Sequence, residues 1–464
     1  MRATAVRTRM LAVGIALGAL VASVGFLPAS STEPDQRLNI VVILTDDQSA
    51  DSIPRTPTVM PFLQERALDP NDHWVVFDQA FVNTPLCCPS RATLLTGRYS
   101  QHTGVFDNED AWRLDEGSTI AALLQGSGYH TGLVGKYLNL YPFGREPFVP
   151  SGWDRWWGKA HGPVTTVYQD YTLIEQGRPV RYGDGESDYS TDVYASKAVE
   201  FIADAPWDRP FFLWFAPTAP HPPWVPAPRH EGRFADLVVP TTPSVGEADV
   251  SDKPAWVRRL RPLDAEARAE MRDARRRSYE TLLAVDDAVR AIVDELRARG
   301  ELDRTLIVFA SDNGFSFGEH RWINKTCPYE ACLRVPFLVR MPSVAHRIED
   351  EIVSAVDLFP TLAEVAGVPA PSGLDGSSLL DLVRTGSAVG LPGEVFAEWL
   401  GDEKLPRWWQ VRSSRFAYIE LATGERELYD LREDPYELVN VVAERRFADV
   451  VRGLAARLDA YRSA

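Results

Sequence analysis

The chain has 464 residues, of which 45% are hydrophobic, and its formal net charge at pH 7 is −16. This length and composition predict one large globular domain with room for a second, smaller one. The acidic balance argues against nucleic acid as a partner, and any anionic ligand must be held by local cations rather than by the whole surface. There are only four cysteines, too few for a disulfide scaffold: Cys87, Cys88, Cys327 and Cys332.

The N-terminal segment has the pattern of an export signal. Three arginines lie within residues 1–9, residues 10–27 are mostly apolar, and small residues at 29–31 offer a cleavage site. We therefore predict a signal peptide over residues 1–31 and a mature protein that is secreted or lies in the periplasm or cell envelope. An uncleaved membrane anchor is the alternative, because the apolar run is near the lower limit for a span. No later segment is apolar enough to cross a bilayer, so the mature form is expected to have no stable span.

Two apolar runs rich in β-branched residues, 38–44 and 306–310, predict parallel strands that are buried on both faces. Each run is followed by polar residues at the carboxyl end, where open α/β sheets place their ligands. These residues are Asp46, Asp47, Asp312 and Asn313. Their side chains offer only oxygen ligands, three of them carboxylates, which favours a hard divalent cation, Ca²⁺ rather than zinc.

The segment 86–98 combines a cysteine, a predicted helix start and an arginine. Pro89 has its φ preset for a first helical turn, so we predict that the helix begins at Pro89–Ser90 and that Cys87 lies just before it. Backbone N–H groups at a helix N-terminus favour an anion, and the Arg91 guanidinium adds a rigid fork of donors suited to a tetrahedral oxyanion. A tyrosine-phosphatase loop is excluded, because neither cysteine has an arginine six positions later.

The same segment resembles the signature of type I sulfatases, Cys-x-Pro-Ser-Arg-x-x-x-Leu-Thr-Gly, at all seven specified positions. The resemblance implies that a formylglycine-generating enzyme oxidises Cys87 to Cα-formylglycine during maturation. The hydrate of that residue is the family's nucleophile and completes the shell of a Ca²⁺ ion. The family's metal ligands correspond to the four residues named above, Asp46, Asp47, Asp312 and Asn313.

Three further residues match family positions that hold or process sulfate. Lys136 and Lys325 correspond to sulfate-binding lysines, and His221 corresponds to a histidine that binds sulfate and can protonate the leaving group. One position departs from the usual pattern, since Leu138 replaces a histidine; either Asn139 orients the hydrate or another base does that work. The sequences Cys-Cys-Pro-Ser-Arg and Lys-Tyr-Leu-Asn resemble N-acetylglucosamine-6-sulfatases and extracellular heparan sulfate 6-O-endosulfatases.

The resemblance covers residues 38 to 462. It implies an α/β fold of the alkaline-phosphatase type, with a large mixed, mostly parallel sheet flanked by helices over residues 38–388. A small antiparallel sheet and a helix are expected over 389–464. The two loops expected to carry substrate specificity are 142–190 and 222–262.

The implied activity is hydrolysis of sulfate monoesters, of a sulfated sugar such as N-acetylglucosamine 6-sulfate or of an aryl sulfate. The alternatives are a phosphate mono- or diesterase of the same superfamily, or an inactive secreted glycan-binding relative. Metal ligands without histidine favour sulfate over phosphate. Whether Cys327 and Cys332 form a disulfide or stay reduced is left open by their spacing.

Overall fold

The computed structural model describes Met1 and residues 35–53 and 59–463. Its centre is a ten-stranded sheet around β1, Asn39–Thr45, which is buried over its whole length. The strands in spatial order are β13 Arg347–Glu349, β2 Trp74–Phe77, β12 Phe337–Arg340, β9 Thr305–Ser311, β1, β8 Phe211–Ala216, β4 His130–Gly135, β5 Arg155–Lys159, β6 Thr172–Glu175 and β7 Arg178–Arg181.

The middle of this sheet is parallel, and antiparallel strands extend it on both sides. β1 pairs in parallel with β8 and β9, and β4 pairs in parallel with β8 and β5. β12 and β6 run antiparallel to their neighbours. Continuous apolar strands are typical of parallel sheets because helices cover both faces. The predicted mixed, mostly parallel α/β sheet is confirmed.

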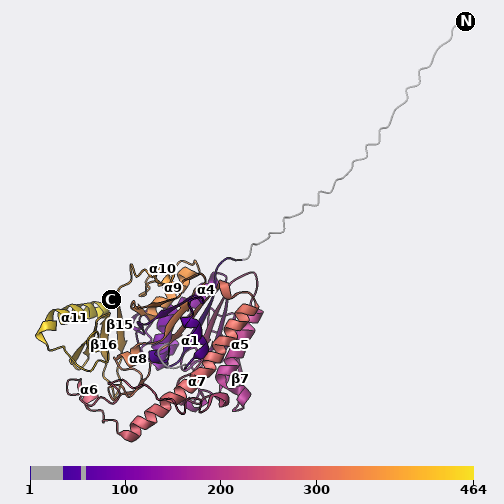
Figure 1. The fold of residues 1–464 in the computed structure, drawn as a ribbon. Coiled ribbons are helices and arrows are strands. Elements are labelled where there is room, and N and C mark those ends of the chain that lie inside the picture. Colours follow the sequence, from indigo (N-terminus) through magenta and orange to yellow (C-terminus); the bar gives the residue numbers. More distant parts are fainter. Residues whose placement is uncertain (2–34, 54–58, 464) are drawn as a thin grey trace.

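Helices cover the two faces of the sheet (Figure 1). Alternate residues of β1 enter two separate cores, with Ile40, Val42 and Leu44 on one face and Val41 and Ile43 on the other. The first core is completed by α2 Cys87–Thr96, α4 Ile120–Gly126, α9 Leu358–Val365 and α10 Leu380–Thr385. The second is completed by α1 Pro61–Leu68, α5 Ser190–Asp204 and α7 Ala265–Ala298.

Asp264 caps the long helix α7 by accepting a hydrogen bond from the Ala267 amide. Another of its residues, Asp286, caps a different helix. The amides of Phe62 and Leu63 at the start of α1 each donate to the Asp286 carboxylate at 2.8 Å. Burial raises the pKa of Asp286 to about 6.

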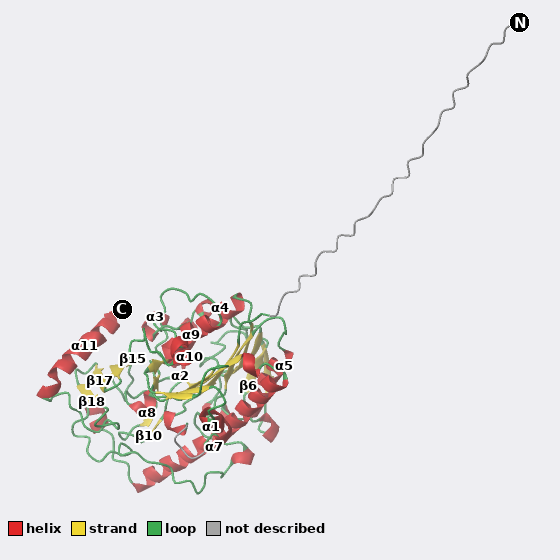
Figure 2. Cartoon of the chain, turned by 45° about the horizontal axis from the view of Figure 1, so that its top comes forward, coloured by secondary structure: helices red, strands yellow, loops and turns green. Residues whose placement is uncertain are grey.

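A second, antiparallel sheet lies beside the main one and packs against the last helix (Figure 2). It consists of β15 Glu394–Trp399, β16 Trp408–Ser413, β17 Phe416–Leu421 and β18 Arg426–Asp430, with α11 Ala448–Ser463 on one side. The remaining short elements are β3 Ala80–Phe81, α3 Ser100–Thr103, α6 Ala255–Arg258, β10 Ser316–Phe317, β11 Ile323–Asn324, α8 Glu330–Leu333 and β14 Val353–Ser354.

A buried polar group links the small sheet to the large domain. The Glu427 carboxylate on β18 accepts hydrogen bonds from the Tyr429 hydroxyl at 2.7 Å and from the Tyr329 hydroxyl at 3.3 Å. Burial raises the pKa of Glu427 to about 7, and the positive charge of Lys253 opposes that rise. The proposed division of the chain at residues 388 and 389 remains a prediction.

Cys327 and Cys332 form a disulfide, with their Cα atoms 5.7 Å apart. The predicted signal peptide over 1–31 lies, apart from Met1, outside the described residues. None of the helices in the described part of the chain combines the length and the hydrophobicity that a bilayer crossing requires.

Candidate active site

Three carboxylates meet where β1 and β9 end. Asp46 and Asp47 follow β1, and Asp312 follows β9, whose Ser311 pairs with Thr45. Asp47 turns back with a φ of 65°, and its amide donates to Asp312 Oδ1 at 3.1 Å. Carboxylate oxygens of the three aspartates lie within 4.8 Å of one another, and all three side chains are buried.

These residues fit a hard divalent cation. The amide nitrogen of Asn313 donates to Asp47 Oδ1 at 2.6 Å, while Asn313 Oδ1 is buried and has no hydrogen-bond partner among the described residues. A buried carbonyl oxygen without a partner is costly, and a cation would satisfy it. The donor set of three carboxylates and one amide oxygen is the one that Ca²⁺ prefers.

The neighbouring charges of the cluster shift the pKa values of two of its carboxylates. Burial and the neighbouring Asp46 raise the pKa of Asp312 to about 6, against the pull of Arg91. Burial would also raise the pKa of Asp46, but Lys136, His221 and Arg91 hold it well below its ordinary value.

Cys87 lies against this cluster. Its Sγ is 3.5 Å from Asp46 Oδ1 and 3.0 Å from Lys325 Nζ, and the residue is fully buried. The helix α2 begins at Cys87 itself, so the predicted start at Pro89–Ser90 was two residues late; Pro89 occupies the third helical position, where its missing N–H also costs nothing. Burial raises the pKa of the Cys87 thiol to about 11, against Lys136 and Lys325.

Two lysines are paired with the carboxylates. Lys136 Nζ is 2.5 Å from Asp46 Oδ2, and Lys325 Nζ is 2.8 Å from Asp47 Oδ1. Burial disfavours both charges, but the aspartates raise the pKa of each lysine. Lys136 directly follows β4, and its amide donates to Ala216 O on β8 at 2.8 Å. The residue before it must be glycine, since a Cβ on Gly135 (φ 104°) would lie 2.2 Å from that same carbonyl oxygen.

Arg91 lies beneath the carboxylates and has no exposed surface. Its Nε is 2.8 Å from Asp312 Oδ2, and one terminal nitrogen donates to Lys136 O at 2.7 Å. The other terminal nitrogen is 4.0 Å from Asp46 Oδ2 and has no hydrogen-bond partner among the described residues. Arg91 thus ties the ends of three segments together: α2, β4 and β9.

His221 follows β8 in the turn between Pro220 and Pro222. Its Nδ1 lies 2.5 Å from Pro222 O and therefore donates to it, and its Nε2 lies 3.7 Å from Asp47 Oδ2. Burial lowers the pKa of His221, and the two aspartates oppose that fall.

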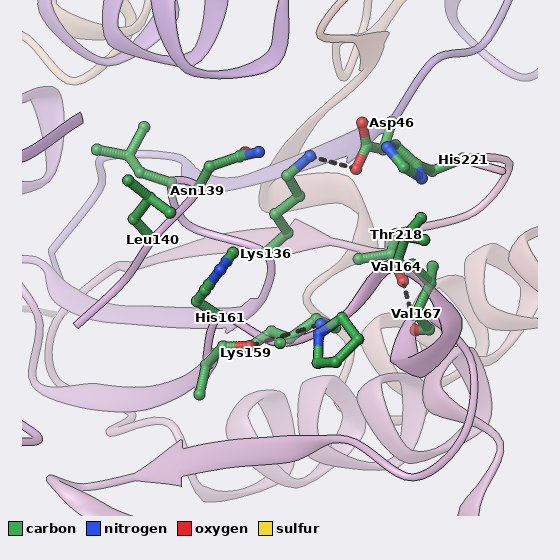
Figure 3. A pocket seen from close by; sticks show the side chains of 14 residues that line it. Asp46, Lys136, Asn139, Leu140, Lys159, His161, Val164, Val167, Thr218 and His221 are labelled. Atoms are coloured by element: carbon green, nitrogen blue, oxygen red, sulfur yellow. Dashed lines mark hydrogen bonds and ion pairs between the residues drawn. The ribbon is translucent and has the colours of Figure 1, made fainter. Parts of the chain in front are cut away.

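A cavity of about 260 Å³ opens beside these residues (Figure 3). Asp46, Lys136 and His221 line one part of it. The other lining residues are Leu138, Asn139, Leu140, Lys159, Ala160, His161, Gly162, Pro163, Val164, Val167 and Thr218. Seven of these residues, between 159 and 167, fall in the segment 142–190, but that segment is not the loop we expected, because it contains β5, β6 and β7 of the main sheet. The segment 222–262 contributes no described lining residue.

Sequence reasoning missed Lys159, His161 and Thr218 as lining residues. Lys159 ends β5, and Gly158 pairs with Gly135 of β4, so the parallel register brings Lys159 to the sheet edge where Lys136 emerges. The residues just before Lys159, Trp156, Trp157 and Gly158, give no indication of which strand lies beside them. At the position that departs from the family pattern, Leu138 is buried, and Asn139 Oδ1 has no partner among the described residues.

A mixed α/β sheet with buried carboxylates, lysines and a cysteine at its carboxyl edge defines an enzyme that acts on a small anionic group. The family model described as Sulfatase matches residues 38–368, and that described as N-sulphoglucosamine sulphohydrolase, C-terminal, matches residues 318–464. The chain belongs to the sulfatase family, whose members are sulfuric ester hydrolases.

Relatives of this chain include N-acetylglucosamine-6-sulfatase of Homo sapiens, 33% identical over 79% of this chain and 68% of that protein. An arylsulfatase of Volvox carteri is 33% identical over 91% of this chain and 74% of that protein. The extracellular sulfatase SULF-1 homolog of Drosophila melanogaster is 34% identical over 76% of this chain, and this match spans only 32% of the fly protein.

Solved structures share the fold. A protein in complex with its substrate D-glucosamine-2-N,6-O-disulfate has a TM-score of 0.80 and 25% identity, covering 92% of this chain and 98% of its own. The phosphonate monoester hydrolase of Agrobacterium radiobacter has a TM-score of 0.70 and 23% identity, covering 92% of this chain and 96% of its own. The second likeness shows the fold alone.

Proposed function

We propose that this protein hydrolyses sulfate monoesters of a sulfated sugar such as N-acetylglucosamine 6-sulfate, with an aryl sulfate as a simpler substrate. The observation that carries the proposal is one buried cluster in which Lys136 and Lys325 pair with Asp46 and Asp47, and Lys325 Nζ also lies 3.0 Å from Cys87 Sγ. The match of the Cys87 segment to the sulfatase signature, together with the family match, supports conversion of Cys87 to formylglycine.

In the mature site, formylglycine at position 87 would supply a hydrated nucleophile, and Ca²⁺ held by Asp46, Asp47, Asp312 and Asn313 would supply a Lewis acid. The two lysine ammonium groups would bind the sulfate oxygens and stabilise the charge that develops in the transition state. The ion pairs with Asp46 and Asp47 hold the ammonium groups of Lys136 and Lys325 in place for this role.

His221 is the proposed proton donor to the leaving oxygen. Its Nδ1–H is engaged by the Pro222 carbonyl, which fixes the ring and leaves Nε2 as the nitrogen that can exchange a proton beside the cavity. Arg91 is assigned a positioning role instead of direct contact with sulfate, because its Nε and one terminal nitrogen already bond Asp312 and the Lys136 carbonyl.

The sugar substrate is supported by the relatives named N-acetylglucosamine-6-sulfatase and by the structural neighbour with a sulfated glucosamine. The apolar wall formed by Leu138, Leu140, Val164 and Val167 offers a face for a sugar ring or an aryl group. Secretion through the signal peptide over 1–31 is proposed on its sequence pattern, and relatives named extracellular sulfatases agree with it.

The test is to co-produce the full chain with a formylglycine-generating enzyme and measure the intact mass of the peptide that carries Cys87. Hydrolysis of 4-nitrophenyl sulfate, 4-nitrophenyl phosphate and N-acetylglucosamine 6-sulfate is then compared with Ca²⁺ and after chelation. We expect an aldehyde at position 87, strong preference for sulfate, loss of turnover on chelation and recovery with Ca²⁺.

Two cysteine variants separate modification from packing. Cys87→Ser is expected to lose turnover, since it gives this chain no formylglycine. The neighbouring Cys88→Ser is expected to keep it, because the serine hydroxyl can accept the Asn139 amide hydrogen bond that Cys88 Sγ now accepts at 2.9 Å. If the enzyme prefers the phosphate ester, the alternative of a phosphate mono- or diesterase is favoured. If Cys87 remains an unmodified thiol, the alternative of an inactive glycan-binding protein is favoured.

A further inference from the structure

Lys159 is a cation of the active-site cavity that no part of the proposed sulfate chemistry uses. It ends β5, next to the strand end from which Lys136 emerges, and it lines the same cavity. Figure 3 shows Lys136 between Asp46 on one side and Lys159 and His161 on the other. Lys159 therefore faces the part of the cavity that lies away from the carboxylates.

Lys159 has no ion-pair partner among the described residues, although the Asp46 carboxylate partly opposes the fall of its pKa. The only polar contact of its Nζ among these residues is the carbonyl oxygen of Ala160 at 3.5 Å. By contrast, Lys136 and Lys325 are each paired with an aspartate. Burial lowers the pKa of Lys159 to about 8, and the charge of Lys136 contributes to that fall. A half-buried ammonium without a paired carboxylate is unfavourable unless a bound ligand supplies the negative charge.

Its surroundings match a sugar that carries such a charge. Next to Lys159 on the chain, His161 adds ring nitrogens that form no described hydrogen bond, and the walls of the cavity are apolar at Leu140, Val164 and Val167. A sulfate oxygen near Lys136 would place the rest of the substrate along this wall and toward Lys159. The cavity therefore offers two cationic side chains, Lys136 beside the carboxylates and Lys159.

We propose that Lys159 binds a second anionic group of the substrate, so that the preferred substrate is a sulfated sugar carrying another sulfate or a carboxylate. This inference rests on the proposed function, because it uses the same cavity. A charge-assisted contact of this kind corresponds to a preference on the order of 10-fold for the doubly anionic sugar.

Binding can be measured without formylglycine. Calorimetry on the full chain with unmodified Cys87 would compare glucosamine 2-N,6-O-disulfate, N-acetylglucosamine 6-sulfate, and N-acetylglucosamine 6-sulfate linked to glucuronic acid. The variants are Lys159→Met, which removes the charge, and Lys159→Arg, which keeps it. Lys197→Met is the matched control, since Lys197 already pairs with Glu175 and Glu200 and does not line the cavity.

The wild-type chain is expected to bind a doubly anionic sugar about 10-fold more tightly, and Lys159→Met should remove that preference while Lys159→Arg and Lys197→Met keep it. Preference for the disulfate assigns a sulfate to Lys159, and preference for the uronate-linked sugar assigns a carboxylate. Equal wild-type affinity for all three sugars would overturn the inference. So would a preference that survives in Lys159→Met, or an equal loss for every sugar.

Measuring kcat/KM for the same sugars and variants, on enzyme that contains formylglycine, distinguishes a failure of the Lys159 site from a failure of the proposed sulfatase activity. A binding preference without hydrolysis of any sulfate ester would retain the role of Lys159 and reject the hydrolase. Hydrolysis with no preference, unchanged by Lys159→Met, would retain the hydrolase and reject the second anionic position.

Discussion

Replacing Arg91 by methionine tests whether this residue holds the active-site strands together. The substitution keeps a long side chain but removes the ion pair with Asp312 Oδ2 at 2.8 Å and the hydrogen bond to Lys136 O at 2.7 Å. Both Arg91 and Asp312 have no exposed surface, so water cannot replace the lost partner. Leaving one charge of a buried pair without its partner costs about 3–5 kcal/mol.

This magnitude is a large share of the 5–15 kcal/mol by which domains are typically stable. Arg91→Lys keeps the positive charge but cannot form both bonds at once, so its expected loss is smaller, about 1–3 kcal/mol for the unmet partner. The order of stability should therefore be wild type, then lysine, then methionine.

The assay is guanidinium unfolding of the full chain, followed by tryptophan fluorescence, with chelator present so that bound metal does not contribute. Arg98→Met is the control, because Arg98 follows the same helix but donates an exposed 3.5 Å hydrogen bond to Ser372 O. Its effect should stay within about 0.5 kcal/mol. A loss below about 1 kcal/mol for Arg91→Met would refute the reasoning.

Three other perturbations test features away from the catalytic residues. Because burial raises the pKa of Glu427 to about 7, wild-type stability should fall as pH rises from about 4.5 to about 7 and then level off. Relative to Glu427→Gln that fall should reach about 3 kcal/mol in urea titrations, and parallel pH profiles would contradict it. The double change Cys327→Ser with Cys332→Ser should cost about 2 kcal/mol, the loop entropy of a short disulfide, and an unchanged Tm would speak against this. Asp286→Ala should cost about 1–2 kcal/mol by uncapping α1, whereas Asp287→Ala, at an exposed ion pair, should cost less than 1; equal effects would reject the cap.

Much of the fold could be predicted from local patterns. The apolar runs at β1 and β9 correctly predicted buried parallel strands. The polar residues after these runs predicted a site at the strand ends. The cysteine motif identified the family through seven positions of one short segment. These features depend on residues close together in the chain, where periodicity, helix starts and turn chemistry act directly.

Positions that depend on the packing of distant segments could not be predicted. The Arg91 guanidinium was expected to suit an oxyanion, and only the tertiary structure showed that it bonds Asp312, 221 residues away in the chain. The start of α2 was also predicted two residues late, because proline is tolerated anywhere in the first turn, not at one position alone.

The sequence by itself indicated the family, through one short motif, and the resemblance then implied the candidate metal ligands, the candidate nucleophile Cys87 and the two lysines. Only the tertiary structure decided that Cys327 and Cys332 are bonded and that Lys159 shares a cavity with Lys136. The physical reason is that the register between β4 and β5 sets which side chains meet, and neither strand encodes that register on its own.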